Sequence, residues 1–163
     1  MAIDTGIGIS LTSVETTRQA PLGQTVLQPA GTDGTGEKVW IYIKALDALA
    51  AGNVVTRDLT AAPAVGLDYD AKLSVAGVTS EFVVGVAQHA IAANSFGWVL
   101  REGQGEVKAD SATVITGAVG LIPGAAAAGT AQVAGAAADN VFGYALESVA
   151  VNLLATCVLA CKG

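Results

Sequence analysis

The chain has 163 residues, enough for one domain with its own hydrophobic core, so its folding needs neither disulfides nor a metal ion. Its net charge of −6 argues against direct binding to nucleic acid, because an acidic surface repels phosphate groups. Hydrophobic residues make up 52% of the sequence and charged residues only 13%, against about 25% charged in typical domains, so we expect part of the surface to be covered by another chain.

The N-terminal part, 1–36, differs from the rest of the chain. It has no aromatic residue, is rich in Thr, Gly, Ser and Gln, and ends in a Gly-rich stretch. Such a segment buries too little apolar surface to order by itself. We therefore expect an extended arm with a Gly-rich hinge, with a disordered tail as the alternative. Ile7, Ile9, Val26 and Leu27 are the arm residues that we expect to dock on a neighbour.

The clearest strand pattern covers 38–44. Val39, Ile41 and Ile43 fall on one face of this segment, and Trp40 and Tyr42 fall on the other. Since both faces are apolar, we expect the strand to be covered on both sides.

The remaining elements are predicted to be short strands separated by turns. Strands are expected at 53–58, 80–88, 96–101, 106–109, 113–122, 141–146 and 156–161, a single helical turn at 45–51, and loops at 60–71 and 124–139. Gly103-Gln104-Gly105 is interpreted as a tight turn between strands, because glycine allows positive φ. The fold class is therefore all-β.

An internal repeat divides the domain expected over 37–163. Residues 85–94 match residues 143–152, a shift of 58 positions, with Gly, Ala and Asn recurring in register. The strands that follow are shifted by 59 positions, which predicts one inserted residue. Two similar halves, about 44–103 and 109–163, predict a small β-barrel or β-sandwich with pseudo-repeated halves, preceded by the arm.

Several pieces of this domain occur in an order that resembles a known family. The pieces are 39–44, 51–55, 84–87, 96–103 and 142–146. In this order they resemble the decoration (cement) proteins of tailed-bacteriophage heads, loosely over 39–163 and without the arm. The resemblance departs from the family at the Ala-rich stretch 125–138 and at the terminal cysteines, which puts the subunit contacts in doubt more than the fold.

The resemblance implies a structural virion protein that is made in the host cytoplasm. Such a protein sits on the outer surface of the capsid as a homotrimer, binds the major capsid protein and stabilises the contacts between capsid subunits. It implies no enzyme activity, no catalytic residue, no cofactor and no metal. On alternating strands, Trp40 and Trp98 are interpreted as core residues or interface anchors, because tryptophan is enriched at such positions, with stacking on sugars or bases as the alternative.

Other functions fit parts of the sequence. A tail or fibre component, or a surface adhesin, would use Trp98 and the 125–138 stretch as a receptor face. A small ligand-binding barrel or a hydrolase would use His89, the single histidine, although no nucleophile-elbow motif is present. The Asp68-Tyr69-Asp70 segment has two carboxylates suited to Ca²⁺, with a solvated loop as the alternative.

The two cysteines are expected to be small buried side chains. Cys157 and Cys161 lie four positions apart, which on a strand separates them by about 13 Å, too far for a disulfide. The most apolar stretch, 149–160, is too short to cross a membrane, and the first residues lack the basic start and apolar run of a secretion signal. We therefore expect no membrane partner.

Overall fold

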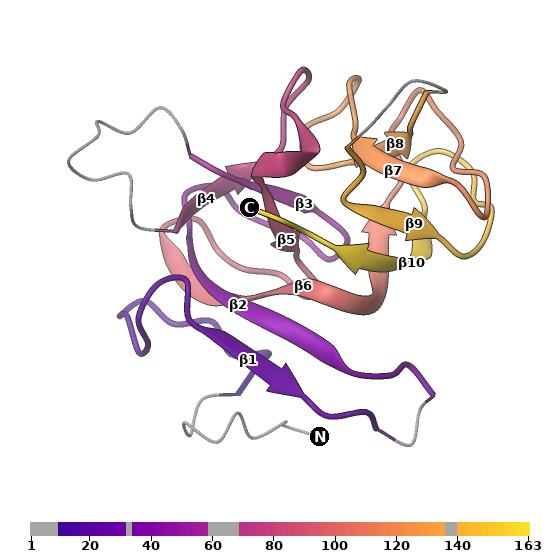
Figure 1. Ribbon diagram of the computed structural model, residues 1–163. Coiled ribbons are helices and arrows are strands. Elements are labelled where there is room, and N and C mark those ends of the chain that lie inside the picture. The colour runs from indigo at the N-terminus through magenta and orange to yellow at the C-terminus, as the bar shows by residue number, and fades with distance from the viewer. Residues whose placement is uncertain (1–9, 32–33, 59–68, 136–139) are drawn as a thin grey trace.

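The computed structural model describes residues 10–31, 34–58, 69–135 and 140–163, and this part of the chain is built from β-strands (Figure 1). The strands are β1 (Thr25–Gln28), β2 (Lys38–Ala45), β3 (Val54–Arg57), β4 (Asp70–Leu73), β5 (Val83–Val86), β6 (Ser95–Lys108), β7 (Gly120–Pro123), β8 (Ala131–Val133), β9 (Gly143–Ala145) and β10 (Leu154–Ala160). One short 3-10 helix covers Ser80–Phe82. No helix among these described residues is long and apolar enough to cross a membrane. The all-β prediction is confirmed.

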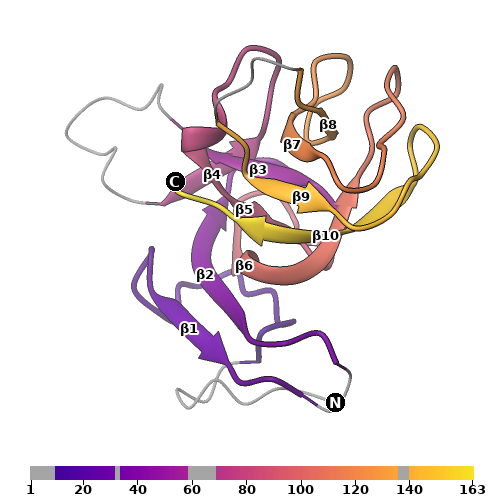
Figure 2. The ribbon, with the colours of Figure 1, turned by 45° about the vertical axis from the view of Figure 1, so that its right-hand side comes forward.

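Five strands close into a barrel in the first half of the domain (Figure 2). Their order is β2–β4–β3–β5–β6, and β6 pairs again with β2 to complete the ring. All neighbouring pairs are antiparallel except β2–β4, where Lys44 lies opposite Asp70 and Ala45 opposite Ala71 in parallel register. Closure leaves no free sheet edge around this ring, which protects an apolar chain from pairing with others.

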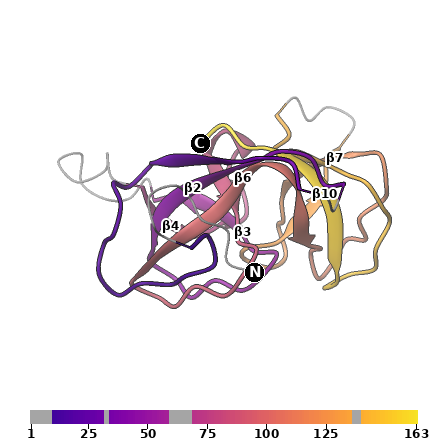
Figure 3. The ribbon, with the colours of Figure 1, turned by 90° about the horizontal axis from the view of Figure 1, so that it is seen from below.

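Strand β6 is shared by the two halves of the domain, which lie beside each other in Figure 3. Its 14 residues pair with β2 over the first part and with β10 over the second. The predicted turn at 103–105 is therefore wrong, because the chain continues as a strand. Gly103 is needed for a different reason: its φ is +105°, and an added Cβ would lie 2.5 Å from the Glu37 carbonyl oxygen.

The second half repeats the pairing of the first. Its sheet runs β6–β10–β9–β7–β8, and a parallel bridge from Ala131 to Ala109 returns to the end of β6. The equivalent parallel bridge in the first half joins Ala45 to Ala71. Both halves also carry an antiparallel bridge between loops, Leu49 to Ile91 in the first and Ile115 to Val149 in the second.

The shift between the halves stays at 58 positions through the last strand. Ala45 and Ala109 make the equivalent parallel bridges, so Ile43 and Val107, two residues before each, are equivalent although 64 positions apart. Ile43 lies opposite Gly97 and Val107 lies opposite Ala155, and these two partners are 58 positions apart. The two turns before these strands also match, because Asn94 and Asn152 both have positive φ, 59° and 64°. The predicted inserted residue is therefore wrong, and Phe96, Trp98 and Leu100 of β6 correspond to Leu154, Thr156 and Val158 of β10.

Two hydrophobic clusters lie on the two sides of β2. Trp40 and Tyr42 belong to the larger cluster, which extends into the second half. Ile41 and Ile43 belong to the cluster that contains only residues of the first half, inside the closed barrel. The prediction that this strand is covered on both sides is confirmed.

The described part of the expected arm, 10–31, packs against its own barrel. Leu11 is 1% exposed and belongs to the larger cluster, and β1 pairs with β2. Glu15 and Phe96 exchange two backbone hydrogen bonds of 3.0 and 2.8 Å. This segment lies on its own barrel rather than on a neighbour because Tyr42, Phe96 and Trp98 form an aromatic group on the outer side of the barrel that it covers.

Other differences concern short elements. The expected helical turn at 45–51 is a loop, in which Leu49 exchanges backbone hydrogen bonds with Ile91. Strand β8 falls within a segment predicted to be a loop, 124–139, and strand β4 begins in the last two residues of another, 60–71. Strands of three or four residues are too short to show alternation, and their pairing with distant segments decides their conformation.

Candidate interaction surface

The outer side of strands β9 and β10 carries an exposed apolar group. Tyr144, Leu146, Leu154 and Val158 are 55%, 53%, 40% and 42% exposed, and we refer to them as the β9–β10 face. Val158 lies directly opposite Tyr144 in the strand register, and the Leu146 backbone N–H donates to the Thr156 carbonyl. The group is therefore continuous across the two strands, and continuous exposed apolar groups mark interaction sites.

The alternation of β10 separates this face from the core. Ala155, Cys157 and Leu159 point inward and are at most 2% exposed. The residues that alternate with them, including Leu154 and Val158, point outward. Both sets of alternate residues are mostly apolar in the sequence, so only the tertiary structure shows which set faces solvent.

Carboxylates surround the β9–β10 face. Glu102 and Glu106 on β6 are exposed and lie opposite Ala160 and Thr156 of β10. Glu147 Oε1 accepts hydrogen bonds from the Thr156 hydroxyl at 2.6 Å and the Thr156 backbone N–H at 2.7 Å. These two bonds hold the pKa of Glu147 below its ordinary value, so the carboxylate stays charged near neutral pH. Lys108 on β6 lies opposite Leu154, so three carboxylates and one ammonium group border the face.

The residues predicted to make contacts lie mostly elsewhere. Trp98 is fully buried, and Trp40 is 7% exposed with its indole N–H donating to Gln28 Oε1 at 2.8 Å, so both are core residues of this chain. Val26 is partly buried against the core, and Leu27 is 57% exposed on β1. Ile7 and Ile9 lie outside the described residues.

His89 is half-buried in the loop after β5 and forms no catalytic arrangement with the described residues. Neither ring nitrogen has a hydrogen-bond partner among them. Partial burial lowers the pKa of His89 below its ordinary value, because the charged form is poorly solvated there. A base in a hydrolytic triad requires a hydrogen bond to a nucleophile and to an orienting group.

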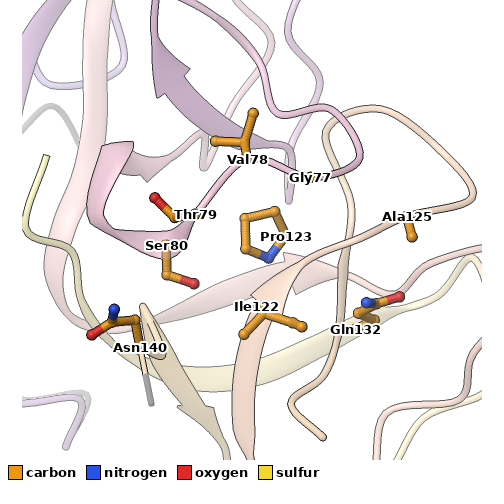
Figure 4. A pocket seen from close by; sticks show the side chains of 9 residues that line it. All are labelled: Gly77, Val78, Thr79, Ser80, Ile122, Pro123, Ala125, Gln132 and Asn140. Carbon is orange, nitrogen blue, oxygen red and sulfur yellow. The ribbon is translucent and has the colours of Figure 1, made fainter. Parts of the chain in front are cut away.

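A shallow cleft of about 440 Å³ lies between the two halves (Figure 4). The loop 77–80 forms one side, and residues of β7, β8 and their connection form much of the other. Its lining residues are Gly77, Val78, Thr79, Ser80, Ile122, Pro123, Ala125, Gln132 and Asn140. None of these side chains is ionisable, so the lining supplies no general acid or base.

Asp110 holds the loop that forms part of this cleft. It is 1% exposed, and its carboxylate accepts backbone hydrogen bonds from Ser111, Ala125 and Ala126 at 2.6, 3.1 and 3.0 Å. Burial by itself would raise the pKa of Asp110. The hydrogen bonds together lower this pKa by more than burial raises it, so the pKa lies below its ordinary value. The same loop places the Gly129 carbonyl against the first half, where it accepts from the Val54 backbone N–H.

The two cysteines are buried free thiols, as predicted. Burial, with a smaller contribution from Glu106, raises the pKa of Cys157 to about 12, and burial also raises the pKa of Cys161. Both stay protonated and unreactive at neutral pH.

No metal-binding group forms among the described residues. Asp70 faces Lys44 at 3.8 Å, and Asp68 lies outside the described ranges. Within those ranges, no cluster of three or more His, Cys, Asp and Glu side chains is suited to a metal ion.

Comparison with known proteins shows a shared fold. No protein-family model matches the chain, and no curated protein gives a significant match. Among solved structures, the chain is similar to the N base of head fiber gp8.5 in bacteriophage phi29. The TM-score is 0.52, the sequence identity is 20%, and the match covers 76% of this chain and 94% of that one.

Proposed function

We propose that the chain is a structural protein of a bacteriophage head, and specifically a decoration protein on the outer surface of the capsid. The observation that carries the proposal is the fold shared with a head fiber base over 94% of that structure. The ordered sequence pieces that resemble decoration proteins support it independently. The proposed role is not enzymatic, and its partners are the major capsid protein and further copies of this chain, in a homotrimer.

The mechanism of such a protein is physical. A head under pressure from packaged DNA fails where capsid subunits separate, and a protein bound across that seam adds a free energy that separation must overcome. Several linked copies convert weak individual contacts into strong overall binding. The closed barrel of the first half supplies a rigid body for this purpose.

The direct test is binding to heads that lack the protein. Purified protein should sediment with such heads up to a saturating ratio and should raise the temperature at which they release DNA. If heads assembled without this protein bind none of the added protein, the proposal is contradicted. A matched sample of heads already carrying the protein controls for nonspecific adsorption.

A second candidate is a fibre component, because the similar structure is itself the base of a head fiber. Gold-labelled antibodies on intact particles separate the possibilities. Labels spread over the head surface support a decoration protein, whereas labels on projecting fibres or on the tail support a fibre component.

A further inference from the structure

The two halves have equivalent outer faces, but only one of them is covered. Phe96 and Trp98 on β6 occupy the positions that Leu154 and Thr156 occupy on β10, as the strand pairing shows. Phe96 is half-buried and its equivalent Leu154 is 40% exposed. Leu100 is fully buried and its equivalent Val158 is 42% exposed.

The cover on the first half is an extended segment of the chain itself. Leu11 and Ala20 are buried in the larger cluster, and Leu22 and Val26 pack against it. The segment is held by two backbone hydrogen bonds between Glu15 and Phe96 and by a 3.2 Å bond from its Gln19 N–H to the Tyr42 hydroxyl. This type of face therefore accepts a peptide that has aliphatic side chains and pairs through its backbone.

The second half has no such cover among the described residues. The four side chains of the β9–β10 face are 40% to 55% exposed. Three carboxylates, those of Glu102, Glu106 and Glu147, and one ammonium group, that of Lys108 opposite Leu154, lie around it, so a strongly acidic occupant would be repelled on balance. The face fits a mainly aliphatic peptide with little negative charge.

We infer that the β9–β10 face binds residues 1–9 of a second copy of this chain. That segment has the required chemistry, because it contains Met1, Ile3, Ile7 and Ile9 and a single charged residue, Asp4. It directly precedes the segment that covers the first half, and Leu11 anchors it to its own barrel. Nine residues reach at most about 30 Å from that anchor. The inference rests on the self-association within the proposed function, but not on capsid binding.

Two variants remove the two sides of this contact. Val158→Glu places a charge in the centre of the face, and deletion of residues 1–9 removes the occupant while keeping Leu11. Sedimentation velocity should show an oligomer for the unmodified chain. Each variant should shift it to its own monomer, which for the unmodified chain is 16.1 kDa, with a dissociation constant at least about tenfold higher. Val114→Glu, at a 55% exposed position outside the face, should leave the oligomer unchanged.

Mixing the two variants tests the pairing itself. Val158→Glu keeps the N-terminal segment and the deletion keeps the face, so an equimolar mixture should form a complex that neither forms alone. Leu146→Glu should replace Val158→Glu in this assay if the latter lowers the unfolding temperature.

Three results would overturn the inference: a monomeric unmodified chain, an oligomer that survives the deletion, or a mixture that stays monomeric. The head-binding assay is read separately. Loss of the oligomer in the variants together with no binding of the unmodified chain to heads would support the inference and reject the proposed function. An oligomer that survives both changes, together with binding to heads, would reject the inference and support the proposed function.

Discussion

The two halves of the domain share a pairing scheme but are stabilised differently. The first half closes through two parallel residue pairs between β2 and β4 and encloses its own cluster of Ile, Val, Leu and Ala. The second half closes through one bridge, Ala109 to Ala131, and its interior is continuous with the outer aromatic side of the first. The same backbone arrangement therefore supports a sealed barrel in one half and an attached sheet with an open face in the other.

Residues at equivalent positions in the two halves contribute differently to stability. Trp98 contacts the Tyr42 ring at 5.0 Å between centroids beneath a chain segment, whereas its equivalent Thr156 lies on the sheet surface beside Glu147. Equivalent substitutions in the two halves should therefore have unequal effects on stability.

The largest difference is expected at this pair. Trp98→Ala should lower the free energy of unfolding by about 3–5 kcal/mol, because it leaves a cavity in the core. Thr156→Ala should lower it by at most about 1 kcal/mol, because it removes one surface hydrogen bond. Urea unfolding followed by circular dichroism measures both. Equal losses would show that the second half is as tightly covered as the first.

Asp110 tests how the second half is held to the first. Asp110→Asn should destabilise the protein by about 1–3 kcal/mol, since an amide N–H₂ would then face backbone N–H groups. The exposed Asp47, whose carboxylate accepts from the Leu73 N–H at 3.0 Å, provides the control Asp47→Asn with a smaller loss.

The pH dependence of Asp110 has a definite sign. Its folded-state pKa is lowered, so its stabilising contribution is fully present above the ordinary value of 3.8 and is lost as the pH falls through the folded-state pKa. The stability gap between the unmodified chain and Asp110→Asn should therefore shrink in acid. A gap that is constant down to the lowest accessible pH would contradict this assignment.

Two equivalent turns should respond in opposite directions. Gly52 and Ala118 both have positive φ, 83° and 63°, and their N–H groups donate to the carbonyls of Ala87 and Ala145, which lie 58 positions apart. Gly52→Ala should destabilise by at least about 1–2 kcal/mol, because the new Cβ would lie 2.9 Å from the Lys108 backbone nitrogen in a left-handed conformation. Ala118→Gly should stabilise by up to about 1 kcal/mol, because it relieves the same strain. Thermal unfolding of the two variants gives the signs directly.

The smallest expected effect concerns His89. Its folded-state pKa lies below the ordinary value of 6.5, so the unfolded chain binds the proton more readily. Its effect on stability is absent above pH 6.5 and becomes destabilising as the pH falls towards the folded-state value. His89→Gln should flatten the stability curve over that range, as measured by thermal unfolding at several pH values. An unchanged slope would show that the ring is solvated in the folded protein.

The all-β class, the two-faced strand at 38–44 and the buried thiols could all be predicted from the amino-acid sequence. These follow from local alternation and from side-chain chemistry, which do not depend on distant contacts. The match of 85–94 with 143–152 also lies in the sequence, including the Asn94 and Asn152 turns.

Which parts of the chain are covered depends on long-range contacts and could not be predicted from local sequence patterns. Leu11 is buried because a distant aromatic group needs a cover, and β6 passes straight through Gly103 because β10 continues the ladder that β2 begins. The exposed side of β10 was equally undetermined, since the alternate residues on each side are mostly apolar. Burial depends on which neighbours long-range pairing brings to each face, and no local pattern contains that information.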